Sequence, residues 1–244
     1  MTVYLVGAGP GDPELISVRG ARLLASADVV LYDRLTRPML CLAAVGAELV
    51  DVGKAPGAAP VAQDEINRLL VDYGRQRECV VRLKGGDPLV FARGAEEATA
   101  LGEAGVDFEV VPGISSALAA PAAAGVPLTS RGVARSFTVL TGHDDPDAAP
   151  TGFWDALVTM DGTIVVLMGA AQIARIAERL IGAGLPPETP AVAVHAATTG
   201  SQQLYRATVG TLGREPVCSP ATFVIGRSAA LDLRSEHRPG ALES

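Results

Sequence analysis

The chain has few aromatic residues and few charged ones, which make up 4% and 19% of its 244 residues. Its cysteines, Cys41, Cys79 and Cys218, are scattered and odd in number, which disfavours both a disulfide framework and a metal site. The longest apolar stretches, such as residues 164–171, fall well short of the ~20 residues that a membrane-spanning helix needs. A formal net charge of −7 disfavours general nucleic-acid binding. We therefore expect a cytoplasmic protein with no metal, no nucleic-acid partner and no membrane segment.

The glycine-rich segment after the first apolar run lacks the motifs of nucleotide binding. Gly7, Gly9 and Gly11 do not form G-x-G-x-x-G, because position 12 is Asp, and no G-K-[ST] follows. Pro10 removes a backbone donor that a phosphate cradle would use. A stiff loop with small side chains, at the end of a first strand, favours a ligand held by shape and by carbonyl acceptors. A plain tight turn fits the same pattern.

The apolar fraction of 48% is typical of a globular protein with a substantial core. In the first half, apolar β-type runs alternate with helical stretches, which is typical of βαβ units and a parallel sheet. We predict strands at 3–6, 29–32, 48–52, 79–83 and 108–111, and helices at 18–26, 37–45, 62–73 and 94–103.

The second half has further apolar runs with different spacing. Residues 198–208 leave no room for a crossover helix, so two strands there pair antiparallel and the second sheet is mixed. We predict strands at 136–140, 163–168, 191–195, 203–208 and 222–225. The fold class is therefore α/β with two domains. We expect an N-terminal domain at 1–113 with a mainly parallel sheet, a linker at 114–132, a C-terminal domain at 133–230 and a flexible tail at 231–244.

Four loops that follow predicted strands of the first half carry unusual residues. They are the Gly/Pro loop, Asp33 with Arg34, Lys54, and the segment 82–88. The carboxyl ends of parallel strands meet at one edge of a sheet, so we expect these loops around one crevice. Taken singly, Asp33 also suits a helix cap, Lys54 a solvated lysine, and 85–87 a surface turn.

Basic residues gather near these strand ends although the chain is net acidic. Guanidinium groups pair bidentately with carboxylates, so such a cluster suits a substrate with several carboxylates. Surface or helix-end positions are the alternative for some of them. The residues are Arg34, Arg37, Lys54, Arg82, Lys84, Arg93, Arg131 and Arg135.

Six segments, taken together and in order, resemble the S-adenosylmethionine-dependent tetrapyrrole methylases, and within them the uroporphyrinogen-III C-methyltransferases. They are VGAGPGDPEL (6–15), ADVVLYDRL (27–35), VVRLKGGDP (80–88), VVPGISSA (110–117), GVPLT (125–129) and TGH (141–143). The resemblance covers about residues 3–227. It implies a two-domain α/β enzyme, usually a homodimer, with an active-site cleft between the domains. It also implies methylation of uroporphyrinogen III at C2 and C7, which gives precorrin-2 for siroheme or cobalamin biosynthesis.

The resemblance assigns roles to single residues. Asp33 would be the proton acceptor and Lys54 the proton donor, although binding a substrate carboxylate suits Lys54 equally well. Among the basic residues, we expect Arg34, Arg93 and Arg131 to bind the tetrapyrrole substrate. The residues expected to contact the methyl donor, S-adenosylmethionine, are Pro10, Gly85, Gly86, Asp87, Val90, Ser115, Ser116, Met168, Ala197 and Ala221.

Four segments depart from the family pattern. Residues 53–60 read GKAPGAAP where G-K-R-x-G-x-H-S is frequent, so an arginine, a histidine and a serine are missing near the substrate. Residues 92–97 read ARGAEE in place of G-R-G-G-E-E, 130–132 read SRG in place of H-R-G, and His195 replaces an acidic residue. Three alternatives therefore stay open. These are a methyltransferase acting on a later precorrin, a non-catalytic S-adenosylmethionine-binding relative, and a nicotinamide-dependent oxidoreductase suggested only by the glycine loop.

Overall fold

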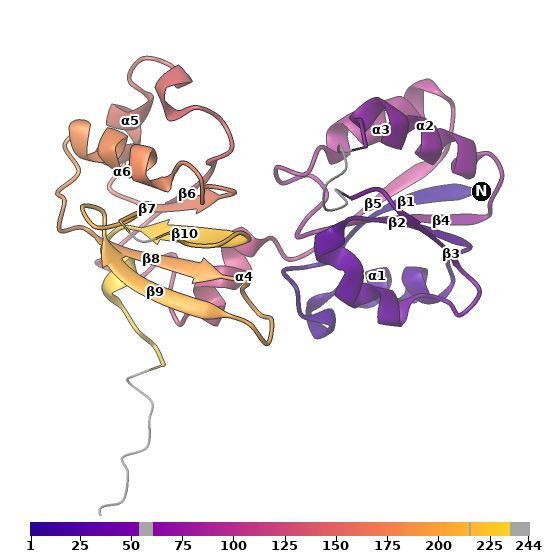
Figure 1. Ribbon diagram of the computed structural model, residues 1–244, viewed down its shortest axis with the longest axis horizontal. Helices are drawn as coiled ribbons and strands as arrows, with labels where there is room; N and C mark the ends of the chain where they lie inside the picture. Colours follow the sequence, from indigo (N-terminus) through magenta and orange to yellow (C-terminus); the bar gives the residue numbers. More distant parts are fainter. Residues whose placement is uncertain (54–60, 215, 235–244) are drawn as a thin grey trace, which may run out of the picture. The chain divides into compact units, whose positions relative to one another are not determined.

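The computed structural model describes residues 1–53, 61–214 and 216–234. The chain divides into two compact units, Met1–Ser115 and Ser116–Ser244, each built around its own five-stranded sheet (Figure 1). The division therefore falls inside the segment 114–132 that the sequence suggests as a linker.

Unit 1 contains an all-parallel sheet with the strand order β3-β2-β4-β1-β5. Its strands are β1 (Thr2–Gly7), β2 (Val29–Tyr32), β3 (Glu48–Asp51), β4 (Cys79–Lys84) and β5 (Phe108–Val111). Strands β1 and β4 lie in the middle and are buried on both faces, as continuous apolar runs in parallel sheets usually are. The predicted parallel α/β fold of the first half is confirmed.

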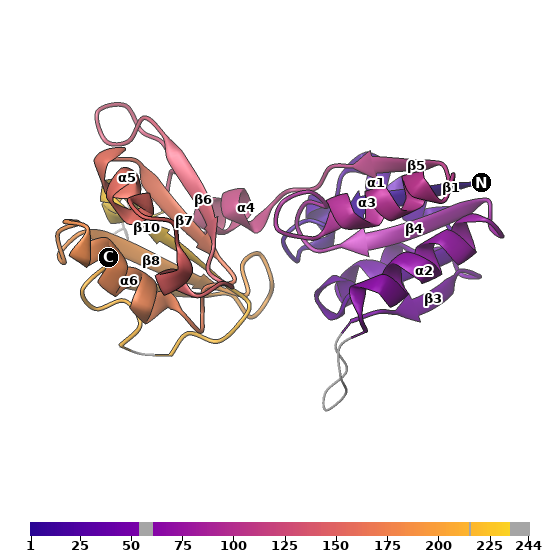
Figure 2. The same cartoon turned by 90° about the horizontal axis from the view of Figure 1, so that it is seen from above.

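Helices cover both faces of this sheet. One face carries α1 (Val18–Ala25), followed along the chain by the 3₁₀ helix η2 (Arg34–Leu42), and the other carries α2 (Gln63–Gly74) and α3 (Gly94–Glu103) (Figures 1 and 2). A short 3₁₀ turn, η1 (Pro13–Leu15), follows β1. Successive strand residues point to opposite faces, so the sheet separates two apolar clusters on its two sides.

The α-helix predicted at 37–45 is wrong in type and position. The chain forms the 3₁₀ helix η2 there, three residues earlier, with Pro38 in its interior. Proline has no N–H and clashes with the carbonyl four residues before it, so an α-helix is strongly disfavoured around this residue. The tighter 3₁₀ geometry accommodates it and starts directly after Asp33.

Unit 2 contains a mixed sheet, as predicted, and its strand order is β6-β7-β10-β8-β9. Only β6 and β7 are parallel; the other neighbours are antiparallel. The strands are β6 (Phe137–Thr141), β7 (Thr163–Leu167), β8 (Pro190–His195), β9 (Gln203–Thr208) and β10 (Ala221–Ile225). Helix α4 (Ser116–Ala123) contacts β7 and β10, so most of its residues, although predicted as linker, pack on this sheet.

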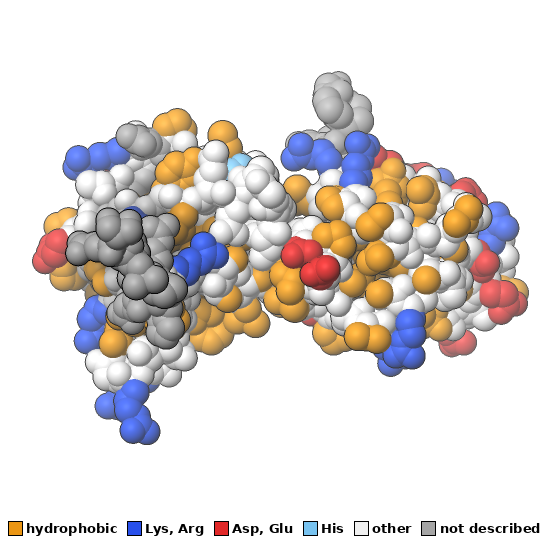
Figure 3. Space-filling model, turned by 90° about the horizontal axis from the view of Figure 1, so that it is seen from below, with side chains coloured by type: hydrophobic (Ala, Val, Ile, Leu, Met, Phe, Trp, Pro, Cys, Tyr) orange, Lys and Arg blue, Asp and Glu red, His pale blue; other side chains and the backbone are white. Residues whose placement is uncertain are grey.

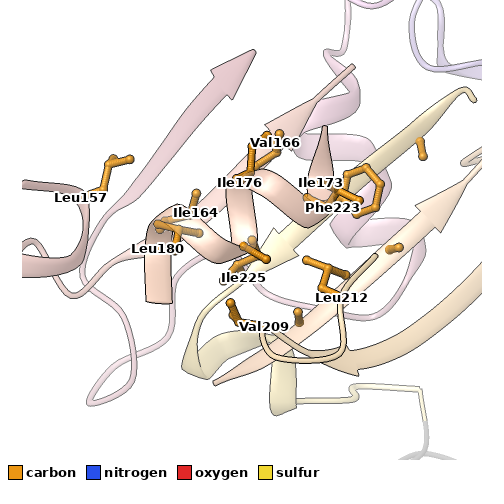
Figure 4. Close-up of a cluster of buried hydrophobic side chains, with 14 residues drawn as sticks. Leu157, Ile164, Val166, Ile173, Ile176, Leu180, Val209, Leu212, Phe223 and Ile225 are labelled. Atoms are coloured by element: carbon orange, nitrogen blue, oxygen red, sulfur yellow. The ribbon is translucent and has the colours of Figure 1, made fainter. Parts of the chain in front are cut away.

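Two further helices, α5 (Phe153–Thr159) and α6 (Ile173–Gly182), cover the face opposite α4. Figure 4 shows Ile173, Ile176 and Leu180 of α6 pointing toward the strands that carry Phe223 and Ile225. These α6 positions recur every three or four residues, which is the period of one helix face. Short 3₁₀ turns, η3 (Pro146–Ala148) and η4 (Arg227–Ala230), complete the unit.

Large apolar side chains are also exposed on unit 1, among them Val18, Leu35 and Val45. Figure 3 shows hydrophobic side chains interspersed with charged ones over the face of unit 1 that carries α1 and η2. Single exposed apolar residues are normal on folded proteins and indicate no partner by themselves. Among the described residues, no helix combines the length and the hydrophobicity that crossing a bilayer requires.

Candidate active site

The carboxyl edge of the sheet in unit 1 brings the Gly/Pro loop and the turn after β4 together. Strand β1 ends opposite β4, with Gly7 paired to Lys84. Beyond the strands, the Gly86 N–H donates to the Gly9 carbonyl at 2.8 Å, and the Gly9 N–H donates to the Gly86 carbonyl at 3.2 Å. Two of the four predicted loops are therefore joined by backbone hydrogen bonds.

Close backbone packing explains several glycines at this edge. A Cβ on Gly7 would lie 2.4 Å from the Gly113 nitrogen, and one on Gly113 would lie 2.2 Å from the Gly86 carbonyl oxygen. Gly7 and Gly113 are thus needed for the strand ends to pack, without reference to a ligand. Gly85 differs, because a Cβ there would meet nothing closer than Thr36 Cγ2 at 4.0 Å.

Asp87 fixes the loop that follows β4. Its Oδ1 accepts from the Leu89 N–H at 2.9 Å and its Oδ2 from the Gly113 N–H at 3.1 Å. The loop also contains left-handed backbone at Gly86, Phe91 and Arg93, with φ of 66°, 52° and 58°. Non-glycine residues in this region store strain of about 1–2 kcal/mol each, and such residues cluster at functional sites.

A cavity of about 320 Å³ opens beside this loop. Asp33, which follows β2, lies in its wall with a side chain that is 36% exposed. Arg93 lines the same cavity, and its guanidinium pairs with Glu96 at 2.6 Å. The lining residues that the structure describes are Asp33, Val52, Gly53, Val61, Gln63, Ile66, Arg82, Lys84, Gly85, Phe91, Ala92 and Arg93.

A buried group of charges forms part of the cavity wall. The Arg82 Nη2 atom lies 3.0 Å from Asp33 Oδ2, and its Nε lies 3.1 Å from Glu97 Oε1. Lys84 Nζ lies 2.8 Å from Glu97. Arg82 and Lys84 thus line the cavity as predicted for basic residues, but protein carboxylates already neutralise them. Burial and the neighbouring Arg82 guanidinium lower the pKa of Lys84, while Glu97 opposes this shift.

Sequence reasoning did not single out Glu97 as a site residue. A signal was present, because Glu97 lies three residues after Gly94 and four before Leu101, and all three are buried on one face of α3. A carboxylate on an apolar helix face points to a buried cation opposite it.

The remaining predicted basic residues differ in their surroundings. Arg37 pairs with Asp51 at 2.5 Å, and the pKa of Asp51 is lowered chiefly by this hydrogen bond. Within the described part of the chain, Arg34 in unit 1 and Arg131 and Arg135 in unit 2 are exposed and have no ion-pair partner. Lys54 and the altered loop around it lie outside the described residues.

In unit 2, the predicted donor-binding residues Met168, Ala197 and Ala221 gather at one sheet edge. Strands β7 and β8 are both antiparallel to β10, so their carboxyl ends lie together where β10 begins. Ala221 pairs with His195, and the next residue, Thr222, pairs with Leu167.

The backbone at this edge of unit 2 is strained. Met168, Ala196 and Thr198 have φ of 56°, 45° and 65°, and none of them is a glycine. Met168 is half-exposed, whereas Ala197 and Ala221 are buried. The His195 ring lies 2.8 Å from the Cys218 carbonyl oxygen, as expected of a satisfied polar residue. Small uncharged residues here suit a neutral or cationic ligand better than a phosphate.

Ser115, which ends unit 1, is buried, and Ser116 begins α4. Pro10 and Val90 lie in the two loops of unit 1 described above and are partly exposed. Across residues 1–53, 61–214 and 216–234, no group of three or more His, Cys, Asp and Glu side chains is arranged to hold a metal ion.

Comparison with known proteins gives consistent matches. The model of the Tetrapyrrole (Corrin/Porphyrin) Methylases matches residues 2–213. The S-adenosyl-L-methionine-dependent uroporphyrinogen III methyltransferase of Methanosarcina barkeri is 44% identical over 248 residues, with 98% of this chain and 96% of that protein covered.

Solved structures agree with this. The uroporphyrin-III C-methyltransferase of Thermus thermophilus, crystallised with S-adenosylhomocysteine, superimposes with a TM-score of 0.82 at 41% identity, covering 94% of this chain and 99% of that one. A cobalt precorrin-4 methyltransferase gives a TM-score of 0.80 at 30% identity, covering 93% and 95%.

Proposed function

Because the chain belongs to the tetrapyrrole methylase family, we propose that it methylates uroporphyrinogen III at C2 and C7 and so forms precorrin-2. The observation that carries this proposal is the 44% identity over nearly the full length of both chains to a uroporphyrinogen III methyltransferase. The reaction is a carbon methylation that uses S-adenosylmethionine and leads toward siroheme or cobalamin. We further propose a cytoplasmic homodimer, as the family resemblance implies.

S-adenosylmethionine supplies an electrophilic methyl group on a sulfonium centre and needs no metal to react. The protein must therefore hold donor and pyrrole carbon in line, and such positioning is worth about 7–11 kcal/mol. We assign donor contacts to Pro10, Gly85, Gly86, Asp87, Val90, Ser115, Ser116, Met168, Ala197 and Ala221. The open position at Gly85 and the uncharged strand ends of unit 2 support this assignment.

Asp33 is the proposed proton acceptor. Methyl transfer forms a carbon–carbon bond, and the electrons of the broken sulfur–carbon bond stay on sulfur, so the macrocycle must then release a proton. A carboxylate that is partly exposed and lines a cavity can reach a bound substrate to take that proton, and the pair with Arg82 holds the carboxylate in place. For Lys54 we keep two roles, proton donation and binding of a substrate carboxylate.

Arg34, Arg93 and Arg131 are the proposed contacts to the acidic side chains of the substrate. The exposure of Arg34 and Arg131 supports this role. Arg93 would exchange its surface pair with Glu96 for a substrate carboxylate, which costs little because exposed ion pairs contribute only about 0–1 kcal/mol.

The test is an anaerobic incubation of the protein with uroporphyrinogen III and labelled S-adenosylmethionine. We expect two labelled methyl groups per macrocycle. Absence of label from every tetrapyrrole, with the donor still bound, would instead identify a non-catalytic relative.

The second candidate is methylation of a later precorrin, which the 30% identity to a cobalt precorrin-4 methyltransferase favours. Parallel assays with uroporphyrinogen III and with later precorrins separate the two. Faster transfer to a later precorrin would replace the first proposal.

A further inference from the structure

Next to Asp33, the protein buries a charge that methyl transfer itself does not require. The Glu97 side chain is 0% exposed, and those of Arg82 and Lys84 are each 3% exposed. Arg82 and Lys84 stand two residues apart on β4 and therefore point to the same face of the sheet, toward α3. Burying an ionised carboxylate is costly unless cations and hydrogen bonds surround it.

The contacts form a chain from Glu97 to Asp33. Glu97 Oε1 accepts from Arg82 Nε at 3.1 Å and from Lys84 Nζ at 2.8 Å. The same guanidinium reaches Asp33 Oδ2 through Nη2 at 3.0 Å and donates from Nη1 to the Leu83 carbonyl at 3.2 Å. A guanidinium is planar and rigid, so its attachment to Glu97 and Leu83 fixes where it meets Asp33.

The charges balance only when Asp33 is counted. Arg82 and Lys84 carry two positive charges, and Glu97 and Asp33 supply two negative ones. Well-packed apolar residues in place of a buried ion pair are often equally or more stable. Stability alone therefore does not account for the arrangement, whereas a need to hold one partly exposed carboxylate does.

We propose that Glu97 is a positioning residue for Asp33: it anchors Arg82 and Lys84 in the cavity wall, and Arg82 in turn orients the Asp33 carboxylate. This inference rests on the proposed function, in which Asp33 accepts the proton released after methyl transfer.

Other charged groups near the cavity must be held constant in any test. They are Arg93 and Glu96 at the start of α3, Asp64 at the start of α2, Arg34 after β2, and the Arg37–Asp51 pair beside β3.

The test is the substitution Glu97→Gln, which keeps the shape of the side chain and one hydrogen-bond acceptor but removes the negative charge. Glu97 would then no longer fix the guanidinium that orients the Asp33 carboxylate. A misplaced base takes the proton more slowly, and we expect kcat to fall about tenfold while the affinity for S-adenosylmethionine is unchanged. Glu97→Asp should recover part of kcat. Glu103→Gln, the same change at the exposed end of α3, should match wild type.

A double variant separates positioning from a general structural role. In an Asp33→Asn background, Glu97→Gln should lower the rate little further, because the group it positions is gone. Equal losses in both backgrounds overturn the inference. Wild-type protein that methylates no tetrapyrrole overturns the proposed function, and an active wild type with equal losses in both backgrounds overturns this inference alone.

The chain offers a second readout that needs no activity. It contains two lysines, Lys54 and Lys84. Labelling lysine with ¹³C therefore gives separate side-chain NMR signals for these two residues. The signals that a Lys54→Arg variant retains belong to Lys84. Because Glu97 raises the pKa of Lys84 against burial and Arg82, Glu97→Gln should make Lys84 lose its proton at lower pH. An unchanged Lys84 titration would show that Glu97 does not hold this group and would also overturn the inference.

Discussion

The two candidate edges, one in each unit, share their backbone packing but differ in their side chains. Both rely on close glycine pairs: a Cβ on Gly7 would lie 2.4 Å from Gly113 in unit 1, and one on Gly142 would lie 2.5 Å from Gly169 in unit 2. Unit 1 then adds four charged side chains around a cavity. Unit 2 adds uncharged residues on strained backbone.

This difference suggests a division of work. Proton transfer and recognition of an acidic substrate need charge, and unit 1 provides it. Most of the proposed donor contacts also lie in unit 1, and unit 2 adds uncharged ones, Met168, Ala197 and Ala221, which suit an adenosyl group and a cationic sulfonium.

The largest effect is expected where the strand ends of unit 1 pack. Gly113→Val places side-chain atoms against the Gly86 carbonyl and the Gly7 backbone, which cannot move aside as a flexible side chain would. We expect the free energy of unfolding to fall by about 3 kcal/mol in urea titrations followed by circular dichroism. Gly46→Ala, where no atom lies within 4 Å of the new Cβ, is the control. Equal behaviour of the two variants would contradict the packing role.

Asp33→Asn tests the chemistry assigned to unit 1. Removing a general base typically slows a reaction about 100-fold or more, so turnover to methylated product should drop by this factor. The affinity for S-adenosylmethionine, measured by calorimetry, should stay the same. A variant that retains wild-type turnover would remove Asp33 from the mechanism, and one that loses donor binding would show that Asp33 also holds the donor.

Met168→Gly tests the strained edge of unit 2. Glycine adopts φ of 56° without the steric cost that methionine carries, so unit 2 should gain up to about 1 kcal/mol while donor binding weakens. Trp154, the one tryptophan of the chain, lies in α5 and reports unfolding of unit 2 by fluorescence. Met160→Gly, at a right-handed helix end, should instead lower stability. Loss of stability in both variants would argue against strain at Met168.

The smallest effect is expected for an exposed ion pair between η3 and α6 of unit 2. Hydrogen bonds from Arg179 and then Arg175 lower the pKa of Asp147. The folded form therefore holds its proton less tightly than the unfolded chain, and the stabilisation is present at neutral pH and lost as pH falls through the lowered value. Asp147→Asn should be slightly less stable than wild type at pH 7, and the difference should close in acid. A gap that persists in acid would rule out the charge as its cause.

Much of the fold of unit 1 follows from local pattern. The strands at 29–32 and 108–111 were predicted with the bounds that the structure has, because short apolar runs lie between polar breaks. The parallel arrangement then places the ends of β1 and β4, and Asp33 after β2, along one edge without further information.

Other features depend on contacts that sequence does not display. The helix at Arg34–Leu42 changes type at Pro38, and α4 consists of small residues whose packing partners lie in β7 and β10. The spacing of Glu97 from Leu101 places it on the buried face of α3, but the two cations opposite it come from β4 and follow from tertiary contacts alone.

Helix α6, in contrast, was missed although its sequence predicts it. Ile173, Ile176 and Leu180 have the spacing of one helix face.

Asp87 has a consequence for recognition. Because both of its oxygens bind backbone N–H groups, of Leu89 and of Gly113, the turn after β4 has one shape before any ligand arrives. Binding of a molecule there costs the protein little further conformational entropy. The affinity therefore depends on how well the conformation of that molecule matches the preformed turn. Such a turn distinguishes ligands by their shape and disfavours those whose binding would distort its backbone.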